Sequence, residues 1–103
     1  MTRYEFKELE TILLGIEALV SKVKNAKENT PLSPSEAISL ADDFAALKQR
    51  AFLWIKKYMT VNTSKEDKKL FQEIAAGLEK LKYVNTQFAP AEMKILIEKL
   101  RNF

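Results

Sequence analysis

The sequence predicts an all-α protein, an antiparallel up-down helical bundle with three long helices and a short C-terminal fourth helix. Apolar residues recur every three or four positions through nearly the whole chain, which is the period of one face of a helix. The strict alternation of apolar and polar residues that is typical of a half-buried strand does not occur. The 103 residues include only two glycines, Gly15 and Gly77, and both fall within predicted helices. Few positions therefore interrupt the helical pattern.

The first helix is expected over 2–27. Thr2 and Glu5 have the spacing of a capping box, in which the hydroxyl and the carboxylate each accept a hydrogen bond from a backbone N–H at the start of the helix. The segment Asn29-Thr30-Pro31 ends the helix. Between these limits one apolar stripe runs at steps of three and four residues, formed by Phe6, Leu9, Leu13, Ile16, Val20 and Val23.

The second helix is expected from Pro34 to about 60, and its start is the clearest local signal in the chain. Ser33 takes the N-cap position, Pro34 takes the first helical position, and Glu36 completes a second capping box. The inner face of this helix is expected to consist of Ala37, Leu40, Ala41, Phe44, Leu47, Ala51, Trp54, Ile55 and Tyr58.

The third helix is expected to follow a break at 61–64 and to run to about 88. Thr63 and Glu66 give a third capping-box pattern, so Thr63 is expected to be its N-cap. Pro90 then starts the short fourth helix. The buried face of the third helix is expected to contain Leu70, Phe71, Ile74, Leu78, Leu81 and Phe88. The apolar side of the fourth is formed by Met93, Leu96, Ile97, Leu100 and Phe103.

Length and composition are those of a single helical-bundle domain that covers residues 1–103. A chain of this length buries a core without the support of metals or disulfides. Apolar residues make up 47% and charged residues 30%, with a net charge of +3. Short connections between the long helices favour antiparallel neighbours. The mild net charge suits a small soluble domain and does not by itself indicate nucleic acid.

The residue types exclude most catalytic chemistry. The chain has no histidine and no cysteine, which excludes the usual zinc sites and the Cys–His and Ser–His–Asp nucleophiles. The two glycines lie too far apart to form a Gly-rich phosphate loop. We therefore expect a protein that is not an enzyme and that uses no metal and no cofactor.

The sequence also bears on location. No stretch approaches 18 uninterrupted apolar residues, so no transmembrane segment is expected. Glu5, Glu8 and Glu10 interrupt the apolar run that a secretory signal would need. A fold without cysteine does not require an oxidising compartment. We expect a cytoplasmic protein.

Several apolar or small residues lie away from the predicted core stripes. On a helical wheel, Leu14 lies on the side opposite the stripe of the first helix, and Leu53 lies opposite that of the second. Such residues indicate a second layer of packing, self-association into a homodimer, or a contact surface for a different protein. The residues predicted to bind a protein partner are Thr11, Leu14, Gly15, Ala18, Phe52 and Leu53.

A basic tip is the second candidate surface. The turn between the second and third helices is expected to bring together Lys56, Lys57, Lys65, Lys68 and Lys69. Clusters of this kind bind the phosphate backbone of nucleic acids, or they make a peripheral contact with an anionic membrane surface. The same lysines also fit a purely structural role, because they form a solvated face or complement a helix C-terminus.

We therefore predict a non-enzymatic small helical-bundle protein that acts by protein–protein interaction, as an adaptor, an inhibitor or an immunity-type binding module. Small, mildly basic, cysteine-free four-helix bundles include the bacteriocin immunity proteins, and this chain is similar to them in size, charge and helix count only. The alternative function is binding of nucleic acid or an anionic surface through the basic tip.

Overall fold

The computed structural model describes residues 3–28 and 31–103, and its described part is all-α, as predicted. Four helices follow one another: α1 (Arg3–Glu28), α2 (Pro34–Tyr58), α3 (Lys65–Lys80) and α4 (Ala89–Arg101). The described residues contain no strand. The cap expected at Thr2 lies outside them.

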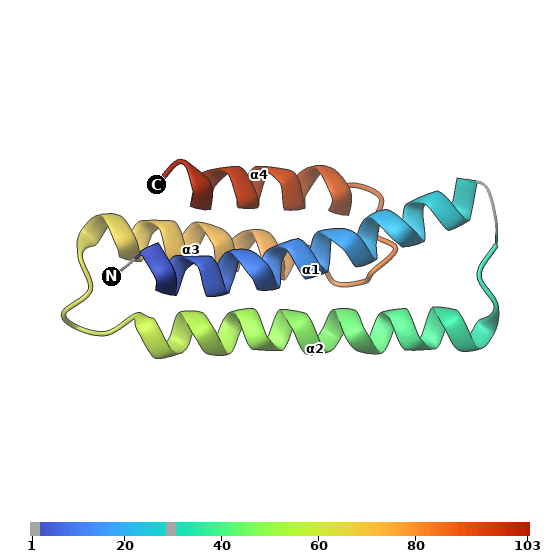
Figure 1. Cartoon of the computed structure of the whole chain (residues 1–103), viewed down its shortest axis with the longest axis horizontal. Coiled ribbons are helices and arrows are strands. Elements are labelled where there is room, and N and C mark those ends of the chain that lie inside the picture. Colours follow the sequence, from blue (N-terminus) through green and yellow to red (C-terminus); the bar gives the residue numbers. More distant parts are fainter. Residues whose placement is uncertain (1–2, 29–30) are drawn as a thin grey trace.

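The helices pack around a ring in which each contacts its neighbours along the chain and α4 closes back onto α1 (Figure 1). The contacts of α1 with α2 and with α4 are the most extensive, and the contact between α2 and α3 is the least. The molecule is elongated, with extents of 47 × 22 × 21 Å. At one end α1 and α2 extend past the connection between α3 and α4 (Figure 1).

Most residues of the apolar stripes predicted from the sequence form the core, although Phe103, expected on the apolar side of the fourth helix, is exposed. Leu9, Leu13 and Ile16 of α1 are completely buried, as are Phe71 and Ile74 of α3. Among the described residues no polar or charged side chain is buried. The burial of apolar surface therefore supplies most of the stability of this fold.

Gly77 is the point of closest approach between α3 and α4. A Cβ atom at this position would lie 2.6 Å from Cδ2 of Leu96, which is closer than side chains tolerate. Leu96 is itself buried in the core. The absence of a side chain at Gly77 thus lets the two helices pack closely.

The helix caps confirm one prediction and correct another. The hydroxyl of Ser33 accepts a hydrogen bond from the N–H of Glu36, and the Glu36 carboxylate accepts one from the N–H of Ser33, which completes the capping box of α2. Thr63 is not the N-cap of α3. That position is taken by Ser64, whose hydroxyl accepts from the N–H of Asp67. The Thr63 hydroxyl instead donates to the carbonyl of Tyr58 and so closes the preceding turn.

The third helix is shorter than the sequence predicted. It ends at Lys80 because Leu81 leaves helical geometry while its side chain stays buried in the core. A turn follows, in which the Thr86 hydroxyl donates to the carbonyl of Tyr83 at 2.7 Å. Phe88, expected in the core, is consequently exposed. At about 1.5 Å per residue, α3 spans about 24 Å and α2 about 37 Å, so α3 cannot cover α2 along its whole length.

Candidate functional site

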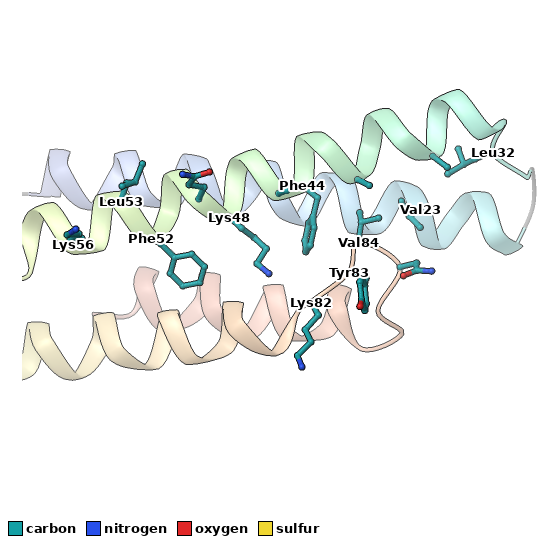
Figure 2. A pocket seen from close by; sticks show the side chains of 15 residues that line it. Val23, Leu32, Phe44, Lys48, Phe52, Leu53, Lys56, Lys82, Tyr83 and Val84 are labelled. Atoms are coloured by element: carbon teal, nitrogen blue, oxygen red, sulfur yellow. The ribbon is translucent and has the colours of Figure 1, made fainter.

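An open groove of about 850 Å³ runs along α2, from the part that extends past the end of α3 to the part that lies beside α3 (Figure 2). Its α2 wall includes Ala37, Ala41, Phe44, Ala45, Phe52 and Leu53. The opposite wall is the start of the α3–α4 connection, with Lys82, Tyr83, Val84 and Asn85. Val23 of α1 and Leu32, which precedes α2, line it as well. The groove joins segments far apart in the sequence.

Small side chains leave part of the groove floor open. Ala37, Ala41 and Ala45 recur every four residues, so they share one face of α2, and all three are exposed. Two of them, Ala37 and Ala41, were predicted to lie on the inner face of this helix. They are exposed because α3 ends before it reaches them.

Aromatic side chains give the groove its apolar character. Phe44 and Phe52 project from α2 toward α3 (Figure 2). Phe44 is buried, and Phe52 packs against the core with part of its surface open to the groove. Tyr83 stands on the opposite wall with 71% of its surface exposed. Large apolar surfaces that remain accessible in a groove are typical of binding sites.

Lys48 is the polar link between the two walls. Its Nζ donates a hydrogen bond of 2.6 Å to the carbonyl of Leu81, which is the C-cap of α3, and lies 5.2 Å from the centre of the Phe44 ring. Partial burial lowers the pKa of Lys48 below its ordinary value, against the opposing effect of the nearby Glu79 carboxylate. The charged ammonium thus complements the negative end of the α3 dipole while losing part of its hydration.

The groove carries charge of one sign. Three lysines line it, namely Lys48, Lys56 and Lys82, and no aspartate or glutamate does so among the described lining residues. Lys56 and Lys82 are exposed. Lys48 has the Glu79 carboxylate nearby, so the positive potential beside the low-dielectric wall comes mainly from Lys56 and Lys82.

The six residues predicted to bind a partner fall on different surfaces. Phe52 and Leu53 line the groove, although the side chain of Leu53 points away from α3 (Figure 2). The four residues of α1 do not line it. Leu14 and Ala18 are exposed on α1, as is Thr11, whose hydroxyl donates to the Lys7 carbonyl. Gly15 faces α2, since a Cβ there would lie 3.2 Å from Cδ1 of Leu47.

The lysines of the predicted basic tip are also divided. Lys56 belongs to the groove. Lys57 lies 5.3 Å from the centre of the Tyr58 ring and shares a shallow depression with the carboxylates of Glu5 and Asp67. The other three, Lys65, Lys68 and Lys69, lie in the first turns of α3. Acidic groups therefore interrupt the positive surface at this end of the bundle.

Sequence reasoning did not find most of the groove. Ala37 and Ala41 were assigned to the core, and Lys48, Lys82 and Tyr83 were not singled out. The signal that was available is the pair Asn85 and Thr86, whose residue types favour a turn over a helix.

Comparison of the chain with protein-family models, with curated proteins and with solved structures finds no match. No helix in the described part of the chain is long and apolar enough to cross a membrane. Within the same residues, no three acidic side chains are grouped so as to hold a metal ion. The groove along α2 is therefore the candidate functional site.

Proposed function

We propose that this protein is a non-enzymatic binding module that acts by protein–protein interaction, as an adaptor, an inhibitor or an immunity-type protein, and that the groove along α2 is its contact surface. The observation that carries the proposal is the groove itself. It combines a volume of about 850 Å³ with an apolar lining in which Ala37, Ala41 and Ala45 stay exposed.

The chemistry of the groove matches that of protein interfaces. Phe52 and Tyr83 offer aromatic surface from opposite walls, and aromatic residues are enriched among the side chains that dominate binding energy. Ala41 and Ala45 between them leave room for the side chains of a partner. The exposed Lys56 and Lys82 add polar groups beside this apolar part, as polar residues do at the rim of an interface.

Two neighbouring alanines of α2 provide a matched test. Ala45 lines the groove and Ala46 does not, and both are exposed, so glutamate at either position leaves the core intact. A carboxylate at position 45 would have to be desolvated under any apolar partner. In capture experiments from the native host, Ala45→Glu should lose at least ten-fold of the partner that wild-type protein retains. Ala46→Glu should retain it.

The readout is the amount of a defined partner band together with the thermal unfolding midpoint of each variant. Equal capture by both variants would show that the groove is not the contact surface. In that case Leu14→Asp tests the exposed surface of α1, which was the other partner surface predicted from the sequence.

The alternative function, binding of nucleic acid or an anionic surface, has weaker support because Glu5 and Asp67 line the same depression as Lys57. It is tested by titrating generic DNA and RNA across a salt series that begins at about 50 mM, since phosphate contacts weaken steeply as salt rises. Tight binding with a steep salt dependence would favour this alternative over the groove.

A cytoplasmic location completes the proposal. The chain contains no cysteine, and an apolar core stabilises the fold, so the protein does not depend on an oxidising compartment.

A further inference from the structure

We infer that the partner segment that fits this groove is an acidic amphipathic helix of another protein. This inference rests on the proposed function, because it names the chemistry of the segment that the groove would bind. Two independent features of the groove support it, one of shape and one of charge.

The shape of the groove favours a helix. The ring of four helices is complete only along the length of α3, and beyond Lys80 the side of α2 that faced α3 has no helix against it. The alanines at 37, 41 and 45 recur at four-residue intervals, the spacing of the ridges by which helices pack against each other. The lining runs about 28 Å along α2 from Ala37 to Lys56, and the part from Ala37 to Lys48, about 17 Å or three helical turns, lies beyond the end of α3.

The charge of the groove favours an acidic helix. Lys48 and Lys56 lie on the α2 wall and Lys82 on the opposite wall, without a carboxylate among the described lining residues. A helix whose apolar edge contacts Phe52 and Tyr83 would carry its flanking residues toward these ammonium groups. Glutamates in the flanking positions would be attracted, and lysines there would be repelled.

A second copy of this chain is a poorer occupant. Each copy carries a net charge of +3, so two copies repel one another where an acidic segment is attracted. Self-association through the groove is nevertheless a measurable outcome of the test described below.

The probe is a pair of designed peptides of 18 residues with blocked ends. Both carry leucines at helical three- and four-residue spacing, flanked by glutamates in the acidic peptide and by lysines in the basic one. A third peptide repeats the acidic sequence with two central prolines, which prevent a helix. Fluorescence anisotropy should show that wild-type protein binds the acidic helix at least ten-fold more tightly than either of the other two peptides.

Charge exchange locates the site. In the double variant Lys56→Glu, Lys82→Glu the preference should invert, so that the basic peptide binds more tightly than the acidic one. The matched control is Lys22→Glu, Lys94→Glu, which changes the net charge of the protein by the same amount at exposed positions outside the groove. The control should keep the preference for the acidic peptide. Lys48 is left unchanged because it caps α3.

Three results would overturn the inference. The first is an equal change of preference in both double variants, which would show that net charge alone governs binding. The second is equal affinity for the helical and proline-containing peptides. The third is concentration-dependent dimerisation in sedimentation experiments that Ala45→Glu abolishes, because a second copy would then occupy the groove.

The proposed function fails separately. If partner capture depends on Ala45 but the peptides show no preference, the groove is a protein-binding site and its occupant is not an acidic helix. If the capture of the partner is unaffected by Ala45→Glu, the groove is not the contact surface at all.

Discussion

The two glycines differ in how closely a neighbouring side chain packs against them, so alanine substitution should change the stability in opposite directions at the two positions. A Cβ at Gly77 would lie 2.6 Å and 2.9 Å from the two Cδ atoms of Leu96, whose side chain is buried in the core and would have to shift. Overpacking of this kind costs about 1–3 kcal/mol, and alanine regains about 1 kcal/mol of helix propensity. Chemical denaturation should therefore show that Gly77→Ala lowers the free energy of unfolding by about 1 kcal/mol.

Gly15→Ala is the matched comparison and should behave differently. Its nearest contact would be Cδ1 of Leu47 at 3.2 Å, and Leu47 is only partly buried, so its side chain has room to move. The gain in helix propensity then dominates, and the free energy of unfolding should rise by about 0.5 kcal/mol. If Gly77→Ala proved as stable as Gly15→Ala, the close packing of α3 on α4 would be wrong.

Lys48 should titrate below the ordinary lysine pKa of 10.5, because partial burial lowers its pKa. Between the folded and unfolded pKa values the unfolded chain binds more protons, so the stability contributed by this group rises with pH through that window. NMR detection of the Lys48 side chain across an alkaline titration measures the midpoint directly. A midpoint at or above the ordinary value would show that the hydrogen bond from the Lys48 ammonium group to the Leu81 carbonyl fully offsets the hydration lost on burial.

At the level of whole helices, the start of α2 depends on its cap. Ser33 and Glu36 satisfy backbone N–H groups reciprocally at 3.3 Å. Ser33→Ala removes the hydroxyl that accepts from the N–H of Glu36, and it should lower the free energy of unfolding by about 1 kcal/mol. The control is Ser39→Ala, an exposed position inside the same helix where alanine is the better helix former. A Ser33→Ala protein as stable as the Ser39→Ala protein would contradict the capping role.

The helices themselves could be predicted because their signals are local. The three-four spacing that contains Leu9, Leu13 and Ile16 identifies a buried face without knowledge of any other helix. The predicted cap of α3 was wrong by one residue, since Ser64 is adjacent to Thr63 and both residue types favour that position. Their roles are decided by the preceding turn, where Thr63 bonds to Tyr58.

The groove could not be predicted in the same way, because it depends on where α3 ends relative to α2. Leu81 continues the apolar spacing of α3, so the sequence predicts a helix beyond it. The structure ends the helix at Lys80 and uses Leu81 as a buried anchor for the turn of Tyr83 and Thr86. Phe52 was predicted to bind a partner because the wheel alone places it beside the inner face of α2, and the structure places it in the lining of the groove.

The unequal lengths of the helices give the whole molecule two regions of different packing. Where all four helices overlap, each is covered by two neighbours around the ring. Past the end of α3, the first half of α2 has only Leu40 and Phe44 buried, whereas the second half buries Ala51, Trp54 and Ile55. Local opening should therefore require less free energy in the first half of α2.

Amide hydrogen exchange followed by NMR measures this difference. Backbone amides over 38–46 should exchange roughly ten-fold faster than those over 51–57, because fewer buried apolar contacts must break for the first segment to open. The capping box at Ser33 limits fraying at the helix start, so the faster exchange reflects the missing neighbour and not a weak terminus. Addition of the acidic peptide should slow exchange over 38–46 in wild-type protein but not in the Ala45→Glu variant, since an occupant of the groove supplies the packing that α3 does not reach. Uniform protection along α2 in the free protein would mean that the connection after α3 already completes the ring, leaving no vacant position for a partner helix.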